Sequence, residues 1–290
     1  MQEDDGPDEV EVEFLRGDED EWRVRLRCND GTIESEIDDC DRRRRSRPRL
    51  QSNRRRPRRD AVMDEFTPYG TSHRLIALLL VVGVVALVAL GRTRRDTVAA
   101  DRDARAFALL TLAFVLPLQV VALTRSGFDV DRTLPLQLCD LAAFVAPFAL
   151  WTRRAWAVGL TYYWGLTLTT QAVITPDLSA DFPDPVFVLF WGMHLLIVWA
   201  AVYLTWGLGL APDWRGYRAT VAVTVGWAMS VSVFNLATGS NYGYLNRKPA
   251  AASILDYLGD WPVYVLAEIV IVLTVWALMT WPWVRSRTGN

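Results

Sequence analysis

The chain has 290 residues, 51% of them hydrophobic, and its 31 basic and 33 acidic side chains leave a formal net charge of -2 at pH 7. From about His73 onward, apolar runs long enough to cross a bilayer recur with only short polar gaps. This pattern excludes an ordinary soluble enzyme and indicates one all-α membrane domain preceded by a charged tail.

Residues 1–62 differ in composition from the rest of the chain. The first 41 residues are rich in Asp and Glu, and residues 42–59 contain eleven arginines. Blocks of like charge usually stay solvated and disordered. The arginine run would suit a tether to anionic lipid or nucleic acid. We favour instead a true start at Met63, with the preceding stretch an over-extended reading frame, and expect no nucleic-acid partner.

Seven apolar runs within residues 63–290 predict a polytopic bundle of seven transmembrane helices. Each has the length that crosses a bilayer core, roughly 17–25 residues at about 1.5 Å rise per residue. The third and fourth runs are separated by little more than Thr152-Arg153-Arg154 and form a helical hairpin. A six-span alternative would make one of these two runs re-entrant. The predicted spans cover residues 73–91, 104–124, 134–151, 155–174, 186–210, 217–238 and 261–283.

The distribution of arginine predicts the orientation of the bundle. Loop 92–105 carries five arginines, loops 152–154 and 212–218 carry two each, and Arg285 and Arg287 follow the last span. On the other side, loop 175–185 has no basic residue, and loops 125–133 and 239–260 have two each. The positive-inside rule then predicts an outside N-terminus and a cytoplasmic C-terminus in a multi-pass protein of the cell membrane. An arginine-rich tail held outside would contradict that rule, and a start at Met63 removes the contradiction.

Strongly polar side chains inside the predicted spans fall in the half of the membrane nearer the outside. The inner half carries Ser, Thr and Tyr instead. Hydrogen bonds that merely hold membrane helices together would be expected at all depths, so this distribution predicts a cavity that opens toward the outer leaflet. The polar residues of the outer half are His73, Gln119, Gln137, Cys139, Asp140, Gln171, His194, Asn235 and Glu268.

Cys139 and His194 are the most informative of these residues. Thiol and imidazole groups are often recruited for covalent catalysis, and a polar group inside a span often marks a functional site. Each residue also has a structural interpretation, because a buried cysteine usually packs as a small hydrophobe. The sequence therefore predicts a candidate Cys–His pair and leaves open a pair that only packs.

Glu268 lies within the apolar stretch VLAEIVIV, where an unpaired carboxylate is costly, so it should be protonated or paired. Its candidate partners are Arg74, Arg247 and Lys248. A catalytic zinc usually takes three protein ligands, and the two histidines of the domain would need Asp140 or Glu268 beside them, so we expect no metal. Neither a phosphate-binding glycine loop nor a nucleotide fingerprint is present, and we expect no cofactor.

Four segments carry a family resemblance: LPLQLCDLAAF (134–144), FWGMHLL (190–196), NYGYLNRKP (241–249) and SILDYLGDWPVY (253–264). Together they resemble the YwaF-like integral membrane proteins, which in turn resemble the eukaryotic transmembrane protein 164 family. The resemblance covers about residues 66–283. The eukaryotic branch is understood as a membrane acyltransferase that moves a fatty acyl group between phospholipids. It implies that Cys139 is the nucleophile and that His194 is its partner.

In such a mechanism His194 takes the thiol proton, and the Cys139 thiolate attacks a lipid ester to give a thioester. Asp140 or Glu268 would orient His194. Gln137, Asn235 or Asn241 would donate hydrogen bonds to the developing oxyanion. The remaining polar residues that we expect to support the site are His73 and Lys248.

Three other functions stay open at this point. Water in place of a lysolipid acceptor would make the protein a lipase. A proton-coupled small-solute transporter would use Glu268, Asp140 and His194 as a proton relay. A non-catalytic membrane scaffold would use the polar residues only to hold helices together. Membrane lipids are the expected partners in every case, and the sequence does not determine the oligomeric state.

Overall fold

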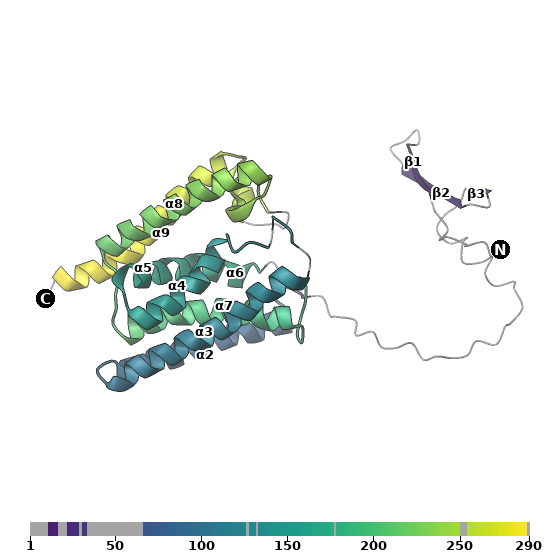
Figure 1. Cartoon of the computed structure of the whole chain (residues 1–290). Coiled ribbons are helices and arrows are strands. Elements are labelled where there is room, and N and C mark those ends of the chain that lie inside the picture. The colour runs from purple at the N-terminus through teal and green to yellow at the C-terminus, as the bar shows by residue number, and fades with distance from the viewer. Residues whose placement is uncertain are drawn as a thin grey trace, which may run out of the picture. The chain divides into compact units, whose positions relative to one another are not determined.

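The protein divides into two compact units, Met1–Asp60 and Ala61–Asn290. Strands β1 (Glu11–Arg16), β2 (Trp22–Cys28) and β3 (Gly31–Ile33) of the first unit form an antiparallel sheet in the order β1-β2-β3. The sequence predicted disorder in this unit and did not anticipate these strands. The computed structural model (Figure 1) describes residues 11–16, 22–28, 31–33, 66–125, 128–131, 133–176, 178–249 and 254–288. Met63 lies outside the described residues, so a start at Met63 stays a prediction.

The described part of the second unit is helical throughout (Figure 1). Its α-helices are α2 (Thr71–Arg94), α3 (Val98–Arg125), α4 (Leu138–Thr152), α5 (Ala155–Tyr163), α6 (Thr169–Ile174), α7 (Pro185–Val202), α8 (Trp214–Thr238) and α9 (Val263–Thr288). Two π-helical segments, η2 (Trp164–Leu168) and η3 (Tyr203–Gly207), continue α5 and α7 without a break. Short 3₁₀ turns, η4 (Tyr242–Tyr244) and η5 (Ile254–Leu258), lie between α8 and α9.

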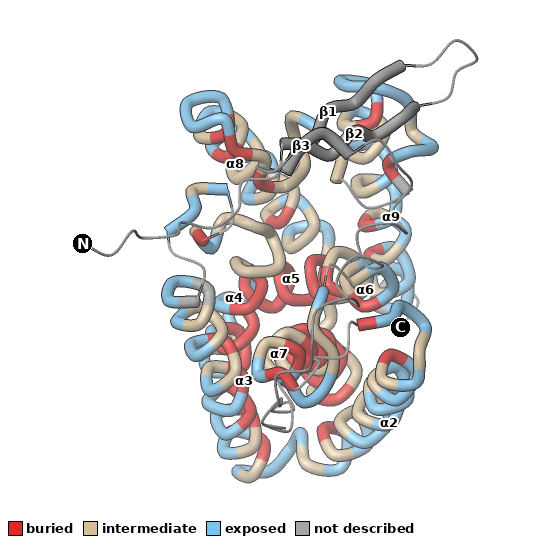
Figure 2. Tube along the Cα trace, turned by 90° about the vertical axis from the view of Figure 1, so that its right-hand side faces the viewer, coloured by how far each residue is buried: buried red, intermediate tan, exposed pale blue. Residues whose placement is uncertain are grey.

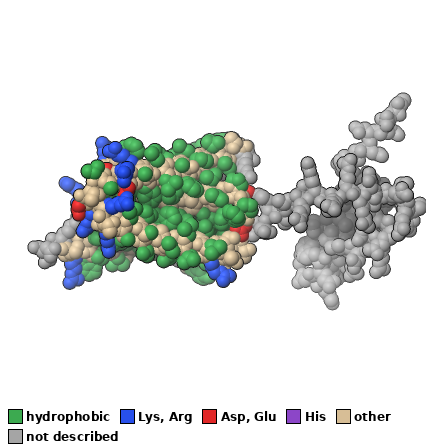
Figure 3. Space-filling view, turned by 90° about the horizontal axis from the view of Figure 1, so that it is seen from below, with side chains coloured by type: hydrophobic (Ala, Val, Ile, Leu, Met, Phe, Trp, Pro, Cys, Tyr) green, Lys and Arg blue, Asp and Glu red, His purple; other side chains and the backbone are tan. Residues whose placement is uncertain are grey.

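Five helices among the described residues are long and apolar enough to cross a membrane: Thr71–Arg94, Val98–Val121, Pro185–Gly207, Trp214–Thr238 and Val263–Ser286. The face seen in Figure 3 is covered by hydrophobic side chains between its two ends. The protein is therefore a multi-pass membrane protein. Helical segments also cover the third and fourth predicted spans, as α4 and as the continuous α5–η2–α6 rod. Whether these two cross the membrane, giving seven spans, stays a prediction.

Helix boundaries follow local capping chemistry. Asp184 precedes α7 and accepts a hydrogen bond from the Val186 amide at 2.6 Å, with Pro185 at the first helical position. Asp213 caps α8 in the same way through the Gly216 amide at 2.8 Å. At its other end α8 stops at Gly239, whose φ of 76° is the left-handed conformation that glycine adopts readily.

Helix α7 occupies the centre of the bundle, and most of its residues are buried (Figure 2). Helices α3, α4 and α5 pack around it, while α2 is exposed along most of its length. Four of the buried residues of α4 are alanines, Ala142, Ala143, Ala146 and Ala149, which lets α4 pack closely against its neighbours. Small residues at a membrane-helix interface allow such close backbone approach.

Helix α3 runs antiparallel to both α4 and α7. At the start of α3, Asp101 forms an ion pair with Arg153 directly after α4, at 2.7 Å. The Phe107 ring packs edge-on against Tyr203 at the end of α7, with centroids 5.9 Å apart. The N-terminal part of α3 thus contacts the C-terminal ends of both α4 and α7.

The two ends of the bundle differ in charge. Arginines gather at one end, where α2 and α4 finish and α3 and α8 begin (Figure 3). We call it the arginine-rich end; it carries Arg92, Arg94, Arg95, Arg102, Arg105, Arg153, Arg154, Arg215 and Arg218. The opposite end, which we call the loop end, carries the segments 128–137 and 239–249. The gathering of arginines at one end agrees with their uneven distribution among the predicted loops. The direction of the bundle across the membrane stays a prediction.

Candidate functional site

The first turn of α4 is tied to the loop that follows α8. Gln137 caps α4: its side chain accepts from the Asp140 amide, while the Asp140 carboxylate accepts from the Gln137 amide at 3.2 Å. The Gln137 Oε1 also accepts from the Gly243 amide at 3.0 Å. The capping residue therefore joins the LPLQLCDL segment to the NYGYLNRKP segment, which are far apart in the sequence.

Two aromatic side chains strengthen this junction. The Leu134 amide donates to the Tyr242 hydroxyl at 3.0 Å, and the Trp227 indole donates to the Leu136 carbonyl at 2.9 Å. Burial raises the pKa of Tyr242, so its phenol stays protonated near neutral pH. A side chain at Gly243 would place its Cβ 2.5 Å from the Trp227 ring, and the Gly243 φ of 68° also favours glycine. The chain before Cys139 is thus held in one position.

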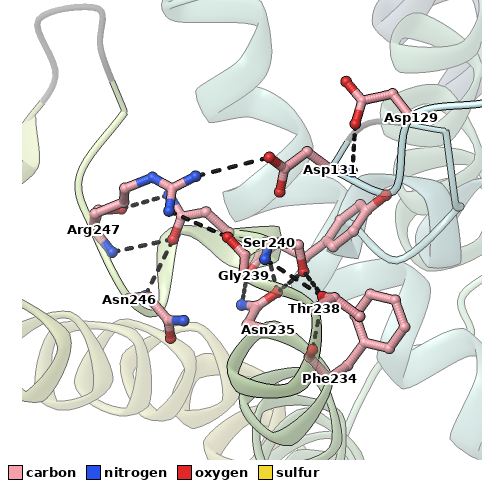
Figure 4. A network of polar contacts seen from close by, with 11 residues as sticks. Asp129, Asp131, Phe234, Asn235, Thr238, Gly239, Ser240, Asn246 and Arg247 are labelled. Atoms are coloured by element: carbon pink, nitrogen blue, oxygen red, sulfur yellow. Dashed lines mark hydrogen bonds and ion pairs between the residues drawn. The ribbon is translucent and has the colours of Figure 1, made fainter.

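Asn235 closes the loop from inside the bundle (Figure 4). It is fully buried, its Nδ2 donates to the Tyr242 carbonyl at 2.9 Å, and its Oδ1 accepts from the Tyr242 amide at 3.0 Å. The Ser240 hydroxyl donates to the same Oδ1 at 2.8 Å. The sequence predicted the Asn235 side-chain amide as a donor to an oxyanion, but this amide binds the Tyr242 carbonyl and closes the loop.

Asn241 holds the next turn of the same loop. Its Nδ2 donates to the Arg247 carbonyl at 2.8 Å, and its Oδ1 accepts from the Asn246 and Arg247 amides at 3.2 and 3.1 Å. Arg247 reaches Asp131 with its guanidinium, at 3.9 Å (Figure 4). The described contacts of Asn241 therefore stabilise the loop.

Lys248 lies at the edge of this loop. Its Nζ is 3.9 Å from the Asp260 carboxylate and 5.8 Å from the centre of the Tyr264 ring. Glu268, one turn beyond Tyr264 on α9, is half-buried and has no ion pair among the described residues. Among the described residues, none of the predicted partners Arg74, Arg247 and Lys248 pairs with Glu268: Lys248 lies near Asp260, Arg247 near Asp131, and Arg74 donates to the Tyr69 carbonyl.

Cys139 is a free, half-buried cysteine at the second position of α4. The first amides of a helix have no carbonyl partner within it, and they give the N-terminus a partial positive charge. The Gln137 Nε2, two residues earlier, donates no hydrogen bond to the described residues. The turn therefore presents a thiol two residues after a side-chain amide whose N–H donors bind none of the described residues.

Asp140 follows Cys139 but is engaged in the helix cap. Besides the Gln137 amide, its carboxylate has the Gln119 side chain of α3 within hydrogen-bonding reach. No hydrogen bond joins it to His194 among the described residues. The Asp140 carboxylate thus fixes α4 against α3, and the predicted orienting contact with His194 is not formed.

His194 is buried in the middle of α7, with 2% of its surface exposed. Its Nδ1 lies 2.7 Å from the Phe190 carbonyl oxygen. A carbonyl only accepts hydrogen bonds, so Nδ1 carries the proton, and in the neutral ring Nε2 is the acceptor. Nε2 has no hydrogen-bond partner in the described part of the chain. His194 therefore holds the tautomer that a general base requires.

Two contacts with α3 show how α4 and α7 are staggered. The Phe114 ring packs directly on Gly192 of α7, and Gln119 lies against Asp140 of α4. The contact to α4 is thus five residues further along α3, a rise of about 7.5 Å toward the loop end.

This stagger separates the candidate pair along the bundle axis. Cys139 is one residue beyond Asp140 toward the loop end, and His194 is two residues beyond Gly192 toward the arginine-rich end. Cys139 therefore lies nearer the loop end of the bundle than His194 does. No hydrogen bond joins the Cys139 thiol to the His194 ring among the described residues.

His73 has a different place in the fold. Its Nδ1 accepts from the Tyr69 amide at 2.9 Å, and its Nε2 donates to the Val173 carbonyl at 2.8 Å. The rings of Tyr69, Phe66 and Trp191 surround it, with centroids 5.2, 5.8 and 5.3 Å away. Both nitrogens are used, so His73 ties the start of α2 to the end of α6.

No group of three His, Cys, Asp or Glu side chains in the described ranges is arranged to hold a metal ion. The described hydrogen bonds also offer no continuous path between Glu268 and either Asp140 or His194. Sequence reasoning missed Trp227, Tyr242 and Gly243 as parts of the site. Tyr242 and Gly243 lie in the NYGYLNRKP segment, which carries the family resemblance, whereas Trp227 lies in α8, where no sequence signal marks it.

Comparison with known proteins gives one match. The model of the TMEM164 family matches residues 68–280, which includes α2 to α8 and most of α9. No curated protein and no solved structure matches the chain. The matched region contains the junction between α4 and the loop after α8, as well as His194. The chain belongs to the TMEM164 family.

Proposed function

We propose that the protein transfers a fatty acyl group between membrane lipids, with the Cys139 thiol as the nucleophile. The observation that carries the proposal is the position of this thiol on the first turn of α4, two residues after Gln137, whose side-chain N–H donors bind none of the described residues. A structural cysteine needs no such donors. A nucleophile that generates an oxyanion does.

The oxyanion donors that we assign are the Cys139 backbone amide and the Gln137 Nε2. Gln137 is held in place because its Oε1 binds the Gly243 amide and the Asp140 amide. The two donors therefore do not reorganise when negative charge develops, which is the property that makes an oxyanion site effective. Asn235 and Asn241 support this arrangement by fixing the loop.

His194 is the base in this proposal. Its Nε2 takes the thiol proton, and the Phe190 carbonyl keeps Nδ1 protonated throughout. The cap at Gln137 and the ion pair at Arg153 hold α4 in place, so the separation between Cys139 and His194 along the bundle has to be bridged by water. Catalytic hydrogen bonds are often long before substrate binds, and we assign the water-bridged contact to the lipid-bound state.

The reaction has two balanced halves. The thiolate attacks the carbonyl carbon of a lipid ester, the ester C–O bond breaks, and the lysolipid oxygen leaves with the proton held by His194. The hydroxyl of a second lysolipid then gives its proton to His194 and attacks the thioester, which frees the thiol. Water in place of this hydroxyl would give a free fatty acid and a lipase reaction.

The experiment uses the full chain with Cys28 and Cys40 changed to Ser, so that Cys139 is its one thiol. The purified protein in liposomes receives a phospholipid with a labelled acyl chain, and acyl-enzyme is trapped by acid and tested for release by hydroxylamine. We expect labelling in this parent, none in Cys139→Ala, and a hydroxylamine-resistant ester at reduced rate in Cys139→Ser. Equal labelling of the parent and Cys139→Ala would overturn the proposal.

A further inference from the structure

A crevice of about 360 Å³ lies between α2, α3 and α7, and its lining includes neither Cys139 nor His194. Helix α4, which carries Cys139, contributes nothing to its lining. Leu87 and Leu90 of α2 face Phe107 and Leu110 of α3 across it. Its size is at the low end for ligand pockets, roughly 300–1,000 Å³, and suits one chain rather than a whole lipid.

The walls of the crevice are fixed by a specific contact between α2 and α7. The Trp199 indole of α7 donates to the Leu80 carbonyl of α2 at 3.0 Å. A Cβ at Gly83 would come within 2.2 Å of the same indole, so glycine is what allows Trp199 to lie against α2. The crevice is thus bounded by a positioned ring rather than by loose packing.

Nearly all of the crevice surface is apolar, and on α3 and α7 the lining residues nearest the arginine-rich end are Asp103 and Tyr203. On α3 the lining runs from Leu110 to Asp103, and on α7 it runs from Leu196 to Tyr203. Asp103 binds Arg94 of α2 at 2.8 Å, and nearly half of the Arg94 side chain is exposed. An occupant of matching chemistry has a hydrocarbon portion and a polar end that meets these groups.

Tyr203 is the unexplained group of the crevice. It is 1% exposed, yet its hydroxyl has no hydrogen-bond partner among the described residues. A buried hydroxyl is normally satisfied, and one that is not usually awaits a ligand or water. Tyr203 also begins the π-helical segment η3, and such segments occur frequently at functional sites.

The crevice lies beside the exposed apolar surface of α2 and α3. Its α2 and α3 walls belong to two of the five candidate spans, and neighbouring apolar residues such as Leu79 and Leu109 are exposed. Bilayer lipid is therefore the material that can reach it laterally. Arginine is the side chain best suited to phosphate, because its planar fork binds two oxygens.

We propose that this crevice binds a phospholipid through one hydrocarbon chain, with the Tyr203 hydroxyl bonded to an oxygen of the glycerol linkage and Arg94 beside the phosphate. The site is separate from the thiol chemistry and does not depend on it. It would hold a resident lipid at the arginine-rich end while transfer takes place nearer the loop end.

The test uses the full chain in liposomes that contain a phospholipid with a photoreactive group in one chain, followed by peptide mapping. We expect crosslinks on the lining residues of α2, α3 and α7. Leu110→Trp fills the crevice and should lower these crosslinks by roughly ten-fold, the effect of blocking a defined pocket that buries most of its ligand. Leu109→Trp is the matched control, because Leu109 is exposed and outside the lining, and should leave them unchanged.

A second measurement does not depend on the filled variant. Tyr203→Phe should unfold at the same or higher temperature without added lipid, because the unpaired hydroxyl is gone. Its lipid affinity should fall roughly five-fold, the worth of about one net hydrogen bond. Arg94→Gln should weaken binding of the phospholipid but not of a free fatty acid with the same chain.

The outcomes separate clearly. Crosslinks spread evenly over the exposed faces of all helices, or equal in Leu109→Trp and Leu110→Trp, would overturn the chain site. Equal lipid affinity of Tyr203→Phe and the parent would overturn the role of the hydroxyl. Loss of acyl-enzyme in Cys139→Ala leaves the crosslinks of this site unchanged, so the two proposals fail independently.

Discussion

The Gly243 amide donates a hydrogen bond to the Gln137 side-chain oxygen across 3.0 Å, although 106 residues separate the two in the sequence. The same side chain caps α4 two residues before Cys139. Because one glutamine serves both the helix and the loop, the position of the thiol depends on the loop after α8. The four predictions that follow test this dependence and the roles of the two histidines.

Replacing Gln137 by alanine should both destabilise the protein and slow acylation. Loss of the cap costs about 1 kcal/mol, and the Gly243 amide left without its acceptor adds about 1 kcal/mol more. Thermal unfolding in detergent measures the loss of stability, and the rate of acyl-enzyme formation measures the slower acylation. Gln171→Ala is the control, since Gln171 is exposed and its side-chain amide reaches only Thr175. Identical behaviour of the two variants would refute the role given to Gln137.

Replacing His194 by asparagine should abolish most of the chemistry while keeping the fold. An asparagine amide can replace the N–H that contacts the Phe190 carbonyl, but it cannot accept the thiol proton. General-base contributions are typically 10²–10⁴-fold, so we expect a rate loss of about that size in single-turnover acylation. A variant that acylates Cys139 at the parental rate would exclude His194 as the base.

Replacing His73 by asparagine should lower the stability of the protein and leave its chemistry intact. The imidazole bridges the Tyr69 amide and the Val173 carbonyl, and both groups lose their partner. The expected cost is about 2 kcal/mol, from two hydrogen bonds at about 1 kcal/mol each. The acylation rate per folded molecule should remain parental. A folded His73→Asn protein without acylation would mean that this histidine also takes part in the chemistry.

Replacing Asn235 by alanine should open the loop after α8. Three polar partners inside the bundle lose their contact, at about 1 kcal/mol or more each, so the total cost should be about 3 kcal/mol. Asn246→Ala is the matched control, because the described Asn246 contact is made by its backbone amide. Circular dichroism during heating compares the two variants. If Asn246→Ala is as damaging as Asn235→Ala, loop closure does not depend on the buried amide.

The positions of the helices could be read from the sequence because bilayer thickness fixes the length of an apolar run. The residues at which the helices begin were less predictable. Helix α4 begins at Leu138 instead of residue 134 because the Gln137 side chain caps it there. Helix α3 begins at Val98 rather than residue 104, since charged residues such as Asp101 and Asp103 are paired at the arginine-rich end. Hydropathy reports neither capping nor ion pairing.

The candidate site was predictable in its composition but not in its contacts. Cys139 and His194 stand out as polar groups in apolar runs, whereas their axial stagger follows from how α4 and α7 each meet α3. Asn235 and Asn241 were predicted as donors to substrate, and both instead bind backbone groups of their own loop. Tyr203 gave no signal at all, because a tyrosine in an apolar helix is ordinary until its missing partner is seen.

The central claim is that Cys139 carries the acyl group, and peptide mass spectrometry tests it most directly. The protein with Cys28 and Cys40 replaced by serine is incubated in liposomes with a phospholipid that has one isotopically labelled acyl chain, then quenched in acid and digested. The account predicts a labelled acyl group on the peptide that contains Cys139, lost on treatment with hydroxylamine. An unmodified Cys139 peptide in a preparation that has consumed labelled lipid would contradict it.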